Sequence, residues 1–197
     1  VNISGKYTAN TADDGGAIFF NGNLIDVNIN GHYNNNQAND TAGVFLFSSN
    51  LTNVVISGDY SNNVAQYCAV YYMSEFTTIT DSSITGDYYD NSANYCVVLL
   101  IEGSISNSNI SGDYTNNHAK KGINIIGDAH NVKMSGNYMN NDISNGSAIY
   151  IMYCDENSVI HDSIFINNTI DDELIIYLES GSLLSADNWF GNNASNY

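Results

Sequence analysis

The chain has 197 residues and a formal net charge of −17, because 21 acidic residues face four lysines and no arginine. Such a charge argues against a nucleic-acid-binding protein, because binding to phosphates needs clustered Lys and Arg. It also opposes adsorption to anionic membranes. The sequence also has no apolar run of about 18 residues, so direct membrane insertion is not expected.

An aromatic residue followed three positions later by asparagine recurs every 24 to 28 residues. A period of about 20 to 50 residues marks a fold of stacked repeats, in which equivalent positions lie above one another. We call each such series of equivalent positions a column. The pairs are Tyr7/Asn10, Tyr33/Asn36, Tyr60/Asn63, Tyr88/Asn91, Tyr114/Asn117, Tyr138/Asn141 and Phe165/Asn168.

Five repeats begin with an Ile-x-Gly-x-Tyr segment, whose alternation of apolar and polar residues is typical of a strand with one buried face. The sixth has Met134 in place of the isoleucine, and the seventh keeps Ile164 next to Phe165 but lacks the glycine, so the column of glycines consists of Gly5, Gly31, Gly58, Gly86, Gly112 and Gly136. The alternation predicts that Ile, Gly and Tyr point inward, with the glycine leaving room for the ring. The asparagines at the following turn are expected to form a ladder of stacked amides.

A second, almost wholly apolar run follows about ten residues after the aromatic and is rich in strand-forming residues. A third, shorter run such as 24–27 leads into the next repeat. The second runs are 17–20, 44–47, 70–73, 97–101, 123–126, 148–152 and 174–178.

These elements predict an all-β fold, a right-handed parallel β-helix of about seven coils. The hand follows from the general rule for parallel crossovers. We expect residues 1–197 to form a single array and, since the chain starts in mid-repeat, to be a segment of a longer surface protein. A sandwich of antiparallel hairpins, the alternative, gives no reason for the fixed columns.

The residue before each repeat tyrosine should point outward, which places Asp59, Asp87 and Asp113 in a row. Carboxylates with neighbouring Ser and Thr oxygens are ligands suited to Ca²⁺, so this row is a candidate metal site and Ca²⁺ a possible cofactor. The alternative is a solvated acidic face that keeps the protein soluble.

The twelfth position after each aromatic forms an apolar and aromatic column, predicted to be an exposed binding stripe. In the alternative interpretation, the assumed phase is off by one residue and the column belongs to the core. Its members are Phe19, Phe45, Tyr72, Leu100, Ile126, Tyr150 and Tyr177.

Cys68 and Cys96 both lie eight residues after a repeat tyrosine, so they should stack on adjacent coils. Parallel side chains in register strain the dihedral angle of a disulfide, which favours free thiols over a bridge. Cys154 belongs to another column.

Three segments carry a resemblance to known surface proteins. Gly15-Gly16-Ala17-Ile18 and Phe165-Ile166-Asn167-Asn168 match the G-G-A-I and F-x-x-N motifs of polymorphic outer-membrane-protein repeats, and Asn188-Trp189-Phe190-Gly191-Asn192 resembles a closing segment. Together they resemble the adhesin-like proteins of methanogenic archaea. The resemblance implies an extracellular, cell-surface protein that contacts a surface protein or glycan of another cell, and it transfers no catalytic residue.

The predicted function is therefore a non-enzymatic binding or structural module that acts through a lateral face. A polysaccharide lyase or glycoside hydrolase on the same scaffold is the alternative, because fold alone does not decide function. Such an enzyme needs converging carboxylates or a basic clamp, whereas the chain has no arginine and few, scattered lysines. A third hypothesis is a structural stalk.

Overall fold

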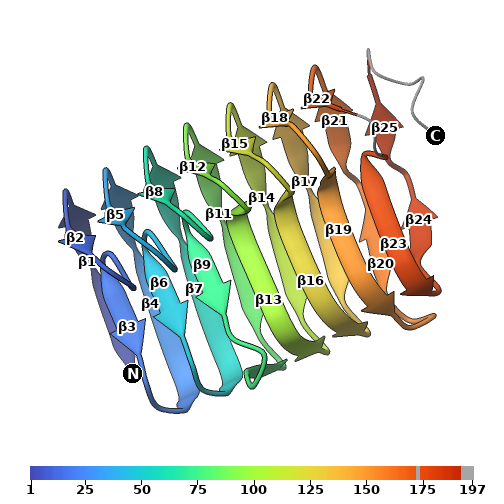
Figure 1. Ribbon diagram of the computed structural model, residues 1–197. Helices are drawn as coiled ribbons and strands as arrows, with labels where there is room; N and C mark the ends of the chain where they lie inside the picture. Colours follow the sequence, from blue (N-terminus) through green and yellow to red (C-terminus); the bar gives the residue numbers. More distant parts are fainter. Residues whose placement is uncertain (172–173, 192–197) are drawn as a thin grey trace.

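A computed structural model describes residues 1–171 and 174–191, and in it the chain winds as a parallel β-solenoid of about seven coils (Figure 1). Each strand pairs in parallel with the equivalent strand of the next coil, so the coils are stacked from the N-terminal to the C-terminal end. The described residues contain no helix. The predicted all-β solenoid is confirmed, whereas Asn192 of the closing motif lies outside the described residues.

Each coil contributes strands to three faces. The first and third faces belong to one 18-stranded sheet, and the second is a 7-stranded sheet. Face 1 carries the repeat tyrosines on six strands: β1 (Asn2–Thr8), β4 (Leu24–Asn34), β7 (Leu51–Ser61), β11 (Ser83–Tyr89), β14 (Asn109–Thr115) and β17 (Lys133–Met139). It continues with Phe165 on β21 (Ile164–Ile166) and Phe190 on β25 (Trp189–Phe190). The short strands β10 (Thr78–Thr80), β20 (Val159–His161) and β24 (Leu184–Ala186) lead into it.

Face 2 consists of β2 (Thr11–Ala12), β5 (Gln37–Ala38), β8 (Val64–Ala65), β12 (Ser92–Ala93), β15 (His118–Ala119), β18 (Asp142–Ile143) and β22 (Thr169–Ile170). Face 3 consists of β3 (Ile18–Phe20), β6 (Phe45–Phe47), β9 (Tyr71–Met73), β13 (Cys96–Ser106), β16 (Gly122–His130), β19 (Ser147–Cys154) and β23 (Ile176–Gly181). The apolar runs of the sequence therefore form face 3, and the two-residue strands of face 2 separate it from face 1.

The corner between faces 1 and 2 explains part of the abundance of asparagine. In every coil the second residue after the aromatic has a φ of 52 to 55°, in the left-handed region. Asn and Asp tolerate that region better than most residues with a side chain. The corner residues are Ala9, Asn35, Asn62, Asp90, Asn116, Asn140 and Asn167.

Stacked aromatic rings occupy the inside of face 1. The repeat rings lie parallel with centroids 4.4 to 5.1 Å apart from Tyr7 to Phe165, and Phe190 continues the stack at 5.0 Å from Phe165. The strand register aligns Ile29, Gly31 and Tyr33 with Ile56, Gly58 and Tyr60. The predicted inward columns are thus confirmed, and the closing motif adds an aromatic that the sevenfold count had not included.

A buried amide ladder runs beside the rings. From Asn10 to Asn141, each ladder Nδ2 donates to the Oδ1 of the asparagine in the next coil at 2.8 to 3.1 Å. The same Nδ2 groups from Asn36 onward donate to the carbonyl of a repeat tyrosine in the preceding coil. The predicted asparagine ladder is therefore present, and it satisfies backbone groups that the corner leaves unpaired.

Candidate functional site

The acidic row lies where the register predicts it. Asp59, on β7, aligns with Asp87 on β11, which in turn aligns with Asp113 on β14. His32 Nδ1 lies 2.7 Å from Asp59 Oδ2, and Asn137 Nδ2 donates to Asp113 Oδ1 at 2.7 Å. The ends of the row thus have compensating partners, which reduces its capacity to bind a cation.

Asp87 is the middle carboxylate. Partial burial, followed by the charges of Asp113 and Asp59, raises the pKa of its carboxyl. Across residues 1–171 and 174–191, no three His, Cys, Asp or Glu side chains form a group suited to a metal ion. The Ca²⁺ site at this row stays a prediction, and a Ca²⁺ titration followed by thermal melting tests it.

We expect Asp87→Asn to increase the free energy of unfolding at neutral pH by about 0.5 kcal/mol, the range of a like-charge pair on adjacent strands discounted for exposure. A raised folded-state pKa means that the ionised form destabilises the fold, so the gain should vanish as the pH falls below the unfolded pKa of about 3.9. Urea denaturation at several pH values measures it. Asp142→Asn is the control, because this carboxylate lies 3.0 Å from His118 Nδ1 and no gain is expected. A gain independent of pH would contradict the argument.

A shallow surface depression of about 350 Å³ extends over this row and brings His161 and Asp162 toward Asp87 and Asp113. His161 Nδ1 lies 2.9 Å from Asp162 Oδ2. The titratable side chains that line this depression include Asp87, Asp113, His161 and Asp162, which an enzyme acting at this place would use.

The predicted binding stripe does not form one column. Phe19 is 53 % exposed, and Tyr72, Tyr150 and Tyr177 are partly exposed, as expected of a surface column. Phe45 and Ile126 were predicted to be exposed and are buried in the main core. Leu100 is also buried, at 1 % exposure. The prediction was therefore wrong at Phe45, Ile126 and Leu100.

The physical reason is a change of one residue in loop length. Phe19 pairs with Leu46, and Leu100 pairs with Ile125. Because side chains alternate along a strand, a shift by one residue moves the twelfth position to the other side of the sheet. The outward column of face 3 is therefore Phe19, Leu46, Tyr72, Leu100, Ile125, Tyr150 and Tyr177.

Leu100 points outward and is nevertheless covered. It forms a small apolar cluster outside the main core with Ile125, Cys68 and Cys96, and Tyr72, Tyr95, Tyr150 and Met152 pack against this cluster. Cys68 and Cys96 align on adjacent coils and are free thiols, as the sequence favoured. Burial, followed by the neighbouring Cys68, raises the pKa of the Cys96 thiol, so this thiol stays protonated at ordinary pH. Its Sγ lies within hydrogen-bond distance of two carbonyl oxygens, those of Leu99 at 3.1 Å and Ile123 at 3.2 Å.

Tyrosines surround this cluster on the outer surface. We call the partly exposed set Tyr67, Tyr72, Tyr95, Tyr150 and Tyr177 the tyrosine face. Tyr67 and Tyr95 stack with centroids 5.1 Å apart, and so do Tyr150 and Tyr177. Tyr67 and Tyr95 were not among the binding residues predicted from the sequence.

Two of the five hydroxyls of this face are bonded to carboxylates. Tyr72 Oη donates to Glu102 Oε2 at 2.6 Å, and Tyr150 Oη donates to Glu179 Oε2 at 3.0 Å. Burial and its hydrogen bond to Glu179 raise the pKa of Tyr150 to about 12, so its hydroxyl remains a donor at ordinary pH. The rings of Tyr72 and Tyr150 are therefore held in orientation, which lowers the entropy that they lose when they bind a partner.

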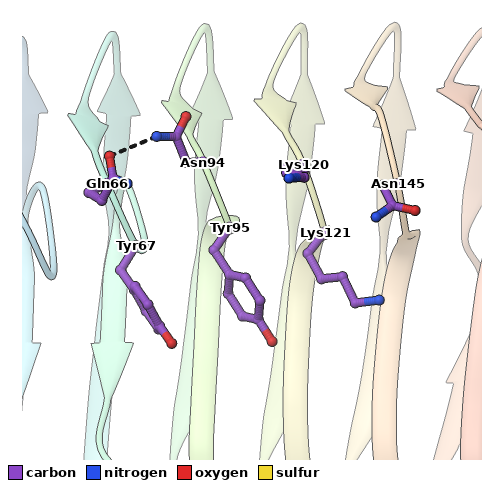
Figure 2. Close-up of a pocket in the computed structure, with 7 residues that line it drawn as sticks. All are labelled: Gln66, Tyr67, Asn94, Tyr95, Lys120, Lys121 and Asn145. Atoms are coloured by element: carbon purple, nitrogen blue, oxygen red, sulfur yellow. Dashed lines mark hydrogen bonds between the residues drawn. The ribbon is translucent and has the colours of Figure 1, made fainter.

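A pocket of about 570 Å³ opens beside the tyrosine face, on the loops between faces 2 and 3. Its size falls within the range of ligand pockets. Figure 2 shows two parallel rows along the stack: amide and amine groups in one, and Tyr67, Tyr95 and Lys121 side by side in the other. The lining residues are Gln66, Tyr67, Asn94, Tyr95, Lys120, Lys121 and Asn145.

Backbone hydrogen bonds between successive coils fix these rows. Lys121 N donates to Tyr95 O, and Asn145 N donates to Lys120 O, both at 2.8 Å. Asn94 Nδ2 donates to Gln66 Oε1 at 2.7 Å. Tyr67, Tyr95 and Lys121 all lie seven residues after a repeat tyrosine, so this position was the signal in the sequence that could have revealed the pocket.

No protein-family model, curated protein or solved structure matches this chain. Within the part of the chain that the structure describes, no helix is long and apolar enough to cross a membrane. The function is therefore argued from the surfaces of the solenoid.

Proposed function

We propose that this chain is a non-catalytic, adhesin-like module of a cell surface, which contacts a surface protein or glycan of another cell through a lateral face of the solenoid. The observation that carries the proposal is the tyrosine face, a row of oriented, partly exposed rings with a pocket beside it. Tyrosines on a rigid scaffold supply large, amphipathic contact area at low entropic cost.

The solenoid suits this role because repetition produces an extended surface. Equivalent side chains recur at the strand spacing of about 4.8 Å, so a partner that is itself a polymer can be contacted at several successive coils. The sequence motifs that resemble archaeal adhesin-like proteins support an extracellular location. The charge of −17 supports partners other than nucleic acids and membranes.

The proposal is tested by measuring adhesion of the purified chain to a panel of archaeal and bacterial cells and of cell-wall polymers. The double variant Tyr67→Ala/Tyr150→Ala should lose adhesion by more than about tenfold, because buried aromatic anchors dominate interfaces. Tyr89→Ala is the matched control, since Tyr89 is 41 % exposed but lies on face 1. Equal loss in both variants, or adhesion by neither wild type nor variant, would contradict the proposal.

The same polymers, incubated with the chain and assayed for new reducing ends or unsaturated sugar products, address the catalytic alternative. We expect no turnover. Turnover that is lost in Asp87→Asn or Asp113→Asn would replace the adhesin proposal with a polysaccharide-cleaving enzyme that acts on face 1.

A further inference from the structure

Some asparagines stand in the pattern Asn-x-Ser/Thr, the acceptor of N-linked glycosylation in exported proteins. Those that belong to the described residues all have exposed side chains. The buried ladder asparagines never carry the pattern, because an alanine or isoleucine of the core follows two positions later. A bulky group on a described member of the set would thus point into solvent. The set is Asn2, Asn39, Asn50, Asn109, Asn145, Asn167 and Asn193, of which Asn193 lies outside the described residues.

The folded chain makes several of these asparagines poor acceptors. Asn2 and Asn109 lie inside β1 and β14, whose backbones are paired with neighbouring strands. The Nδ2 of Asn39, the atom that would receive the sugar, donates to a carboxylate oxygen of the preceding coil at 2.9 Å. A transferase recognises the hydroxyl of the third residue together with the asparagine. In the pattern that begins at Asn145 this residue is Ser147, which is 0 % exposed.

Asn50 meets these conditions. It lies in the loop between β6 and β7, and the side chains of Asn50 and Thr52 are both exposed. The Oδ1 of Asn50 accepts a hydrogen bond from Thr78 N in the next coil at 2.9 Å. This bond holds the carbonyl arm of the planar amide and leaves Nδ2 on the other arm. Glycosylation replaces one hydrogen of Nδ2, so the bond to Thr78 is retained.

The loop of Asn50 joins face 3 to face 1, whereas the pocket lies on the loops between faces 2 and 3. These two sets of loops are at opposite edges of face 3 (Figure 1). A hydrated glycan on Asn50 would therefore flank face 3 and leave the tyrosine face and its pocket open to a partner.

We propose that Asn50 is the attachment site of an N-linked oligosaccharide. In the transfer, Nδ2 forms a bond to the anomeric carbon of an oligosaccharide carried on a lipid phosphate. The bond between that carbon and the phosphate oxygen breaks, the lipid phosphate leaves with the electron pair, and a base of the transferase takes the amide proton. The inference rests on the proposed function, because this modification belongs to exported chains.

The test is mass spectrometry of chymotryptic peptides from the chain recovered from the surface of its native cells. We expect the peptide that contains Asn50 to carry the mass of an oligosaccharide. Thr52→Ala removes the hydroxyl of the pattern and should abolish this mass, whereas Thr52→Ser keeps the hydroxyl and should retain it. Thr80→Ala is the matched control, because Thr80 pairs with Thr52 from the next coil and belongs to no acceptor pattern.

Two results would overturn the assignment: an unmodified Asn50 in the wild type, or a glycan that persists in Thr52→Ala. Adhesion that still depends on Tyr67 and Tyr150 would then leave the proposed function standing. Thr52→Ala should adhere as strongly as the wild type. If its adhesion is lost together with the glycan, Asn50 is confirmed as the site, and the proposed contact through the tyrosine face is overturned. Circular dichroism of each variant shows whether the solenoid is intact.

Discussion

Asn91→Ala should lower the free energy of unfolding by about 3 kcal/mol, a large part of the stability of an ordinary domain. The Asn91 side chain is 1 % exposed and accepts hydrogen bonds from the backbone N and the Nδ2 of Asn63, both at 3.0 Å. It also donates to the carbonyl of Tyr60 at 2.9 Å. Alanine leaves these buried groups without their partner, and each such loss costs about 1 to 3 kcal/mol.

Urea denaturation followed by circular dichroism measures the effect. Asn91→Asp keeps the shape but replaces the donor by a carboxylate oxygen facing Asn117 Oδ1, so we expect at least as large a loss at neutral pH. Asn109→Ala, at an exposed position of β14, is the control and should change stability by less than about 0.5 kcal/mol. If Asn91→Ala lowered the free energy of unfolding no more than Asn109→Ala, the amide ladder would make no measurable contribution to stability.

The parts of the fold predicted from sequence are those at fixed distances from the repeat tyrosine. No loop intervenes between Ile110, Gly112, Tyr114 and Asn117, so their spacing is set by one strand and one corner. Each must also fit the same slot in every coil, which restricts the residue type. Periodicity alone therefore revealed the core columns of face 1, the amide ladder and the row of Asp59, Asp87 and Asp113.

Face 3 follows a loop whose length varies, and there the prediction was only partly correct. The outward residue lies 13 positions after the tyrosine at Leu46, 12 at Tyr72 and 11 at Ile125. The twelfth position consequently predicts the outward side at Tyr72 and the wrong side at Phe45 and Ile126. Pairing between coils corrects these shifts in the folded chain, and a single sequence contains no direct record of that pairing.

The pocket depended on the same loops. Its side chains come from the segments between faces 2 and 3, where Gln66 precedes Tyr67 and Lys120 precedes Lys121. The residue type at these positions changes from coil to coil, so they do not form a column of one residue type as the repeat tyrosines do. A binding surface built on the variable part of a repeat is typical of solenoid proteins, because the core positions are constrained by stacking and the loops are not.

The glycine column leads to the second large effect. An alanine Cβ at Gly112 would lie 2.3 Å from the carbonyl oxygen of Gly86 and 2.8 Å from Cε2 of Tyr88, both in the preceding coil. The backbone at Gly112 cannot move away from Gly86, because β11 and β14 are paired both before and after these two glycines. We expect Gly112→Ala to lower the free energy of unfolding by about 3 kcal/mol, the upper range for overpacking.

Gly22→Ala is the matched control, since a Cβ there meets no atom within 4 Å. Urea denaturation of both variants gives the comparison, and near-ultraviolet circular dichroism reports whether the stacked rings remain ordered. In a double-mutant cycle with Tyr88→Leu, which removes one of the two clashing atoms, Gly112→Ala should recover only part of its cost relative to the single Tyr88→Leu variant, because the Gly86 carbonyl remains. Full recovery would show that the glycine is required by the ring alone; no recovery would show that the approach of the two backbones sets the whole cost. Partial recovery, the expected result, would show that the Gly86 carbonyl and the Tyr88 ring both limit the space at Gly112.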